Sequence, residues 1–199
     1  MDFTKARTYI QERLRSELSN QLHYHGYHHT LDVVIASQKI GGLEGVSEKE
    51  LTLLQTAAWY HDSGFLLGYQ GHEELGCQIA EQQIAQCDYS PEEIQRVKDM
   101  IMATKVPQQP KDSLGEILCD ADLEYLGGDN YYSVAESLRK ELWERQIISD
   151  HRAWVEMQIQ FLKNHHYFTK SAKERYAANK KARLAELESQ LMEMDANPS

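Results

Sequence analysis

Residues 57–62 of the chain read Ala57-Ala58-Trp59-Tyr60-His61-Asp62, an apolar segment that ends in an adjacent histidine and aspartate. Leu51, Leu54 and Ala58 recur at helical spacing, so this segment is predicted to end a buried helix. A single histidine on a helix is more often capped or solvated than a ligand. Two adjacent polar side chains at a buried helix end, however, lose hydration energy unless a charged partner compensates them. A divalent metal ion would do so, which makes the pair candidate metal ligands.

Helical patterns continue on both sides of this segment. Ser47 with Glu50 forms a capping box, and Ser90-Pro91-Glu92-Glu93 forms a second one with proline at the first helical position. No window alternates apolar and polar residues as a strand would. The sequence therefore predicts an all-α protein of about eight helices, a single domain over residues 1–199. Its last helix is expected at about residues 169–192.

Composition narrows the function classes. Hydrophobic residues make up 41% of the 199 residues, the mean hydropathy is −0.62, and no apolar run approaches the roughly 20 residues that span a bilayer. The first residues lack the apolar core of a signal peptide. We therefore expect a cytoplasmic protein without a membrane partner, whose Cys77, Cys87 and Cys119 are reduced and mostly buried thiols. The oligomeric state is open, a homodimer included.

Charge argues against a general nucleic-acid surface, which usually carries a basic excess. The net charge here is −10, and only residues 170–183 are noticeably basic. An acidic protein can still bind a small phosphate ester if a metal ion supplies the local positive charge. A small phosphorylated substrate is thus compatible with the composition.

A second metal-capable residue lies in Cys119-Asp120-Ala121-Asp122-Leu123. Leu118 and Asp122 are four residues apart and share one helical face, so Asp122 is expected next to the core and Asp120 on another side. A carboxylate in that position needs an arginine, a helix N-terminus or a metal ion. Alone this motif is weak, and together with His61-Asp62 it is stronger.

The third group of candidates precedes and opens a helix at Tyr24-His25-Gly26-Tyr27-His28-His29. His25 and His29 share a face if the helix begins early enough; otherwise a turn at Gly26 sets their separation. His28 points about 100° away from His29 on a helix and is expected to face solvent.

The order His29, His61-Asp62, Asp122 resembles the HD superfamily of metal-dependent phosphohydrolases. Three segments look like the cyclic-nucleotide phosphodiesterases within it, and the resemblance covers residues 24–128. These segments are Tyr24-His25-x-x-x-His29, Ile101-Met102-Ala103-Thr104 and Ala121-Asp122-Leu123. The resemblance implies an HD-domain helical bundle that hydrolyses a phosphate ester, expected to be a nucleotide or another small phosphorylated metabolite, with a metal-bound water.

The resemblance also implies roles for single residues. The metal ligands would be His29, His61, Asp62 and Asp122, a nitrogen and oxygen set that suits Mn, Mg, Fe, Zn or Ni. His25 would stand where the phosphodiesterases place a general acid, and Asp62 would be placed to bridge to a second ion if one binds.

Further residues are candidate contacts of the substrate phosphate or of a second metal. In many HD proteins a His-Glu pair at the place of His72-Glu73 has this role, although Glu73 could also simply favour the helix dipole. Lys105 could hold a phosphoryl oxygen or be an ordinary solvated lysine. Arg175 and Lys180 lie in the basic segment that resembles the last helix of HD relatives, where a solvated helix face is the alternative.

Departures from the phosphodiesterase pattern limit the assignment. Gly26 replaces an asparagine, Lys105 replaces an acidic residue, and no histidine occurs between His72 and His151. The incomplete histidine set leaves a mononuclear or loosely dinuclear hydrolase as the expectation. The alternatives are an HD module that senses a nucleotide without turnover and an HD-fold iron-dependent oxygenase.

Overall fold

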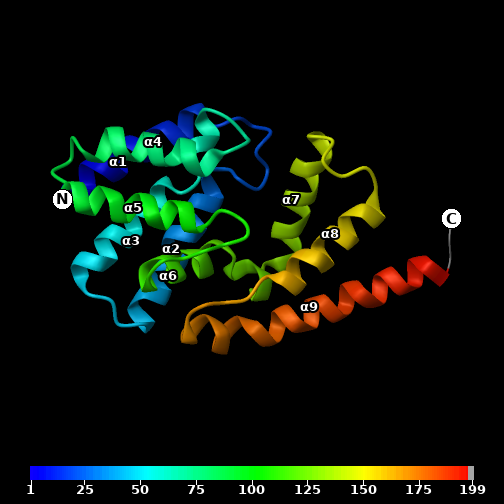
Figure 1. The fold of residues 1–199 in the computed structure, drawn as a ribbon. Helices are drawn as coiled ribbons and strands as arrows, with labels where there is room; N and C mark the ends of the chain where they lie inside the picture. The colour runs from blue at the N-terminus through cyan, green and yellow to red at the C-terminus, as the bar shows by residue number, and fades with distance from the viewer. Residues whose placement is uncertain (197–199) are drawn as a thin grey trace. The chain divides into compact units, whose positions relative to one another are not determined.

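The computed structural model describes residues 1–196, and these residues form nine α-helices and two short 3-10 helices without any strand (Figure 1). This architecture confirms the all-α prediction. The elements are α1 (Phe3–Glu17), α2 (Tyr27–Leu43), α3 (Glu48–Tyr60), η1 (Ser63–Leu66), α4 (His72–Ile84), α5 (Pro91–Ala103), α6 (Ser113–Asp122), η2 (Glu124–Gly127), α7 (Tyr131–Glu144), α8 (His151–Asn164) and α9 (Lys170–Ala196).

Two helix starts have the capping boxes that the sequence predicted. The Ser47 hydroxyl accepts from the Glu50 N–H and the Glu50 carboxylate accepts from the Ser47 N–H, which starts α3. The same reciprocal pair between Ser90 and Glu93 starts α5, with Pro91 at its first position. Each box satisfies backbone donors that a helix start leaves without a partner.

Residues 1–196 form nine α-helices where the sequence predicted about eight, and the first of them is α1. Its mean character is polar, and its buried side is a narrow stripe of three residues at four-residue spacing, Ala6, Ile10 and Leu14. The Tyr60 hydroxyl donates to the Ala6 carbonyl at 2.8 Å. This hydrogen bond ties α1 to the end of α3, next to the candidate metal ligands.

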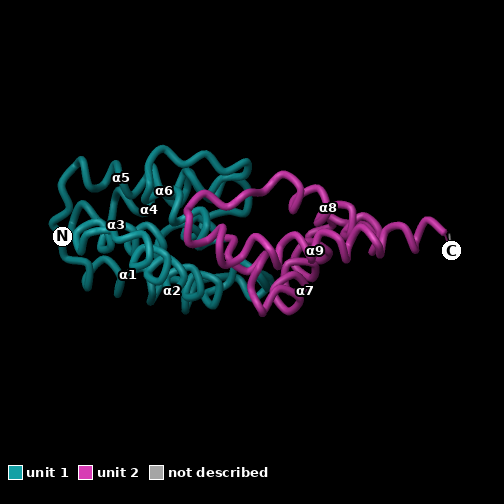
Figure 2. The backbone as a smooth tube through the Cα atoms, turned by 90° about the horizontal axis from the view of Figure 1, so that it is seen from below, with its two compact units in different colours: residues 1–122 teal, residues 123–199 magenta. Residues whose placement is uncertain are grey.

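The chain divides into two compact units, one of residues 1–122 and one that begins at Leu123 (Figure 2). In the first unit α3 is the central helix, because it packs against α1, α2, α5 and α6. Leu53, Leu54, Ala57 and Ala58 on this helix have no exposed surface. The expectation of a single domain over residues 1–199 stays a prediction.

In the second unit α9 packs against η2 and α8. A β-carbon on Gly127 would lie 2.2 Å from the Tyr176 carbonyl oxygen, so only glycine permits this close approach of η2 and α9. Among residues 1–196, none of the helices combines the length and apolar character that crossing a membrane requires.

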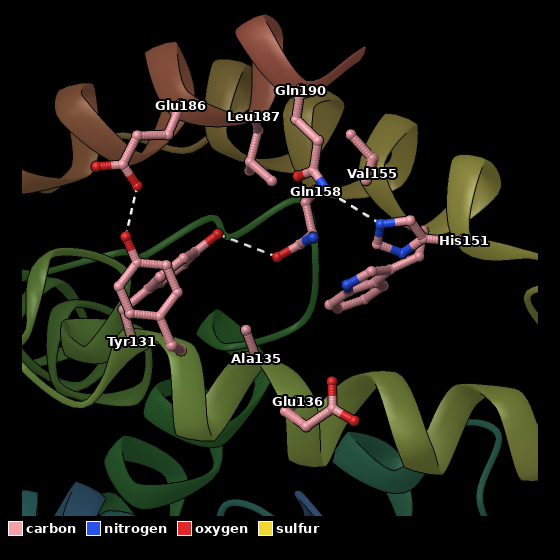
Figure 3. Close-up of a pocket in the computed structure, with 11 residues that line it drawn as sticks. Tyr131, Ala135, Glu136, His151, Val155, Gln158, Glu186, Leu187 and Gln190 are labelled. Atoms are coloured by element: carbon pink, nitrogen blue, oxygen red, sulfur yellow. Dashed lines mark hydrogen bonds between the residues drawn. The ribbon is translucent and has the colours of Figure 1, made fainter. Parts of the chain in front are cut away.

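The second unit also has a pocket of about 200 Å³ between α7, α8 and α9 (Figure 3). Its polar groups are largely paired with one another: the Tyr131 hydroxyl donates to Gln158 and the Gln190 amide lies 2.9 Å from His151 Nε2. The pocket is smaller than the roughly 300–1,000 Å³ of ordinary ligand sites. The four predicted metal ligands, His29, His61, Asp62 and Asp122, all lie in the first unit.

Candidate metal centre

His61 follows the last residue of α3, and its ring is fixed by the backbone of that helix. Its Nδ1 lies 2.8 Å from the Ala58 carbonyl oxygen, which can only accept, so Nδ1 carries the proton. In the neutral ring Nε2 then has a free lone pair, directed away from α3. Metal-binding histidines in proteins are commonly oriented by a hydrogen bond of this kind.

The ring of His61 meets side chains from two other helices. His29 lies in the first turn of α2, and its Nε2 is 3.1 Å from Asp122 Oδ1 at the end of α6. His61 Nε2 lies 3.6 Å from the same carboxylate oxygen. One ligand atom from each of the three residues falls within 4.8 Å of the others, so this cluster could hold a metal ion.

The fourth predicted ligand, Asp62, lies beside two members of this cluster. Its Oδ2 lies 3.2 Å from His61 Nε2 and 3.5 Å from His29 Nε2. Ligands about 2.1 Å from one ion are about 3.0 Å apart in octahedral and about 3.4 Å apart in tetrahedral geometry, close to these separations.

Two atoms of the cluster have no hydrogen-bond partner although they are buried. These are His61 Nε2 and Asp62 Oδ2, whose mutual geometry does not make a hydrogen bond despite their proximity. A buried polar atom without a partner costs about 1–3 kcal/mol, and more if it is charged. A cation bound between them would compensate both, so the donor set fits a divalent metal ion.

The charges of the cluster are strongly coupled. Burial lowers the pKa of His61, but the Asp62 and Asp122 carboxylates outweigh it and raise the pKa to about 9. Burial raises the pKa of Asp62, but the positive charge of His61 and the other histidines brings it below its usual range. The two carboxylates therefore favour a positive charge at this place.

His72 and Glu73 lie at the edge of this cluster, at the start of α4. His72 Nε2 is 3.5 Å from Asp62 Oδ1 and 3.5 Å from Glu73 Oε1. Asp62 thus has one carboxylate oxygen near His29 and His61 and the other near His72. The predicted place of a second metal or a phosphate contact is compatible with this arrangement.

His25 lies in the loop before α2, because the helix begins only at Tyr27 and Gly26 is its N-cap. The turn at Gly26, rather than a shared helical face, therefore sets the separation of His25 and His29. The ring centroids of His25 and His29 are 6.1 Å apart, and those of His25 and His72 are 6.0 Å apart. His28 is exposed, as predicted.

The three predicted basic contacts are not members of the cluster that could hold a metal ion. Lys105 is exposed, and its ammonium forms an ion pair with Glu74. Arg175 and Lys180 lie on α9 in the second unit, where the Lys180 ammonium donates to the Leu162 carbonyl at 2.9 Å. Burial lowers the pKa of Lys180. The roles of these three residues stay predictions.

Sequence reasoning missed several features of the site. Asp120 faces away from the cluster residues in helical phase but is fully buried. Phe65 stacks on His72 with ring centroids 4.0 Å apart. A β-carbon on Gly64 would lie 1.9 Å from the His72 carbonyl oxygen, so η1 and the start of α4 are in backbone contact. For Phe65 and Gly64, the only signal in the sequence was that both residues follow His61-Asp62 closely.

Comparisons with known proteins bear on the fold. The chain matches no protein-family model, and none of the curated proteins is similar to it in sequence. Two solved structures are similar over nearly the whole chain. One is YpgQ of Bacillus subtilis in complex with ADP, with a TM-score of 0.64 and 19% identity over 100% of this chain and 98% of that chain.

The other is a protein of Lactobacillus plantarum, with a TM-score of 0.65 and 18% identity over 98% of this chain and 95% of that chain. At these identities the similarity concerns the fold alone. The chain thus shares its helical architecture with YpgQ and the Lactobacillus plantarum protein.

Proposed function

We propose that this protein is a metal-dependent phosphohydrolase of the HD superfamily, with its metal held by His29, His61, Asp62 and Asp122. The observation that carries the proposal is the buried pair of atoms without a hydrogen-bond partner, His61 Nε2 and Asp62 Oδ2, inside this cluster. Three helices converge to form the cluster, and its members follow the order of the HD motifs along the chain.

The donor set favours a reactive metal over a structural one. Two imidazoles and two carboxylates are hard and borderline ligands, whereas closed structural zinc sites are usually rich in cysteine thiolates. The three cysteines are free and buried, and none belongs to the cluster. We propose Mn, Mg, Fe, Zn or Ni as the ion, with His72 and Glu73 available for a second one.

When bound, the ion lowers the pKa of a coordinated water from roughly 15.7 towards about 7 and offsets charge on the phosphoryl oxygens. The residues of the chain would hold the ion and position the substrate phosphate. His61 is held by Ala58 so that its Nε2 faces the cluster. Asp62 links the cluster to His72, which would hold a phosphoryl oxygen or a second ion.

His25 would act as the general acid. An imidazolium can donate a proton to the leaving oxygen of a phosphate ester. The ring of His25 lies 6.0 Å from that of His72 and 6.1 Å from that of His29, centroid to centroid. A substrate phosphate bound at the cluster would therefore lie near the metal ligand His29 and near the proton donor His25.

A nucleotide is the proposed substrate class. YpgQ, which shares the fold, was crystallised with ADP. With a net charge of −10 the chain itself offers little attraction for a phosphate away from a metal. The metal would then bind the phosphate of a nucleotide. The walls of the site would select its sugar and base.

The test is a substrate screen on the full chain, stripped with a chelator and reloaded with each of the five metals in turn. The panel contains phosphomonoesters, nucleoside mono-, di- and triphosphates and cyclic nucleotides, with products followed by chromatography. We expect hydrolysis that Asp122→Ala abolishes while circular dichroism shows the fold retained. His28→Ala, which changes the exposed neighbour of His29, is the control and should keep full activity.

Other outcomes would replace the proposal. Full activity in both His61→Ala and Asp122→Ala would contradict the metal site. Nucleotide binding without turnover under any metal would indicate a sensing module instead. Oxygen consumption with Fe²⁺ and no hydrolysis would indicate an oxygenase.

A further inference from the structure

Phe65 lies three residues after Asp62 in the 3-10 helix η1, and 8% of its surface is exposed. Its backbone N–H donates to the Asp62 carbonyl at 3.1 Å, which holds the backbone of Phe65 next to the candidate ligand Asp62. We propose that Phe65 is a positioning residue, which holds the rings of His25 and His72 beside the cluster. The inference rests on the proposed function for its catalytic consequence, but not for its geometry.

The His72 ring stacks on the ring of Phe65. The two centroids are 4.0 Å apart with planes at 19°. The polar contacts of His72 are long: Nδ1 lies 3.4 Å from the Tyr69 carbonyl oxygen, and Nε2 lies 3.5 Å from Asp62 and from Glu73. Ordinary N–H···O hydrogen bonds measure about 2.7–3.2 Å. The stack on Phe65 therefore restrains the plane of the His72 ring.

The same ring contacts His25, which comes from a different part of the chain. The centroids of Phe65 and His25 are 4.4 Å apart with planes at 32°. His25 precedes α2 and His72 opens α4, so Phe65 connects two segments that are far apart in the sequence. Offset aromatic stacks of this kind are favourable beyond the area that they bury.

Position matters for both histidines because each would act on a bound phosphate. A general acid contributes about 10²–10⁴-fold only when its proton lies within hydrogen-bond reach of the leaving oxygen. Leucine at position 65 would fill much of the same space but offer no ring face. Both imidazoles could then rotate away from the cluster without any change in the four metal ligands.

The experiment compares Phe65→Leu, which removes the ring, with Phe65→Tyr, which keeps it. Phe161→Leu is the matched control, since Phe161 stacks on His165 in the second unit. The first readout needs no activity: the rate at which diethyl pyrocarbonate modifies each histidine of the metal-free chain, measured by peptide mass spectrometry. Phe65→Leu should raise the rates at His25 and His72 at least about threefold and leave His166 unchanged. Phe65→Tyr should restore the wild-type rates.

The second readout is turnover, with metal content measured on the same samples. Phe65→Leu should lower kcat about tenfold or more, change KM less than about threefold and leave the metal content unchanged. Phe65→Tyr should recover kcat. Unchanged modification rates in Phe65→Leu would overturn the inference, and so would raised rates with an unchanged kcat. If the wild type has no hydrolase activity, the proposed function fails, and the modification rates alone decide whether Phe65 positions the two rings.

Discussion

At the scale of single residues, the imidazole of His61 is already oriented for metal binding without a bound ion. Its Nδ1–H is engaged by a main-chain carbonyl, and its Nε2 is left among carboxylates without a hydrogen bond. Substituting Ala58 cannot remove the carbonyl, whereas His61→Ala removes the ligand itself. The tautomer is therefore fixed by the path of the backbone at the end of α3.

Gly64 is predicted to be intolerant of any side chain. A β-carbon there would lie 1.9 Å from the His72 carbonyl oxygen, and both partners are backbone. Gly64→Ala must therefore displace η1 or the start of α4, and we expect a loss of about 1–3 kcal/mol or more in the free energy of unfolding. Urea denaturation followed by circular dichroism measures it.

The control is Gly42→Ala, because Gly42 is exposed within α2 and no atom lies within 4 Å of the added carbon. Alanine is favoured over glycine inside a helix by about 0.5–1 kcal/mol, so this variant should be as stable as the wild type or more stable. Equal stability of the Gly64 and Gly42 variants would contradict the close packing of η1 on α4.

The cysteines are predicted to be unreactive in the native protein. Burial raises the pKa of Cys77 to about 11, and it also raises the pKa values of Cys87 and Cys119. A raised pKa keeps a thiol protonated, so at pH 8 only about one Cys77 in 1,000 would be the reactive thiolate. An Ellman titration should find almost no fast-reacting thiol in native protein and three after denaturation. A thiol that reacts at once in the native state would contradict this burial.

Some residues of the site were predictable from the sequence and others were not. His61 and Asp62 stood out because two polar side chains end an apolar segment, and Asp122 because of its phase on a helix. Phe65 carries no such signal, since a phenylalanine after a helix is equally expected in an ordinary core. Its role depends on which rings the tertiary fold brings to it.

At the scale of elements, α3 depends on its capping box for a defined start. Ser47→Ala removes the acceptor of the Glu50 N–H and should cost about 1 kcal/mol, within a range of roughly 0.5–2. Thermal or urea unfolding measures the loss. Metal content should not change, because the cluster lies at the opposite end of the helix.

Ser189→Ala is the matched control for this prediction. Ser189 is exposed in the interior of α9, where alanine is a better helix former than serine. A Ser47 variant as stable as the Ser189 variant would show that the box contributes nothing measurable.

The elements show why helix starts were easier to predict than helix number. Ser47 and Ser90 mark helix starts through capping boxes, which are local in sequence and need no tertiary contact. The first helix, α1, buries Ala6, Ile10 and Leu14 in a stripe too narrow to dominate its polar composition. Its helical state is stabilised mostly by packing on α3, which local patterns do not contain.

At the scale of the whole molecule, the cluster of buried charges should make stability depend on metal. A ligand that binds only the folded state stabilises it by about 2.7 kcal/mol at 100 times its Kd. For a chain of this size that corresponds to a rise in Tm of about 5–10 °C. Calorimetry with and without a chelator should show this shift in the wild type and not in His61→Ala. An equal shift in both would place the metal elsewhere.

The most direct test of the account is the metal content of the full chain at equilibrium. The stripped protein is dialysed against each candidate ion, and bound metal is counted by plasma mass spectrometry. We predict at least one tightly bound ion per chain in the wild type and in His28→Ala, and its loss in both His61→Ala and Asp122→Ala with the fold retained. Undiminished metal in both of these variants would contradict the metal centre.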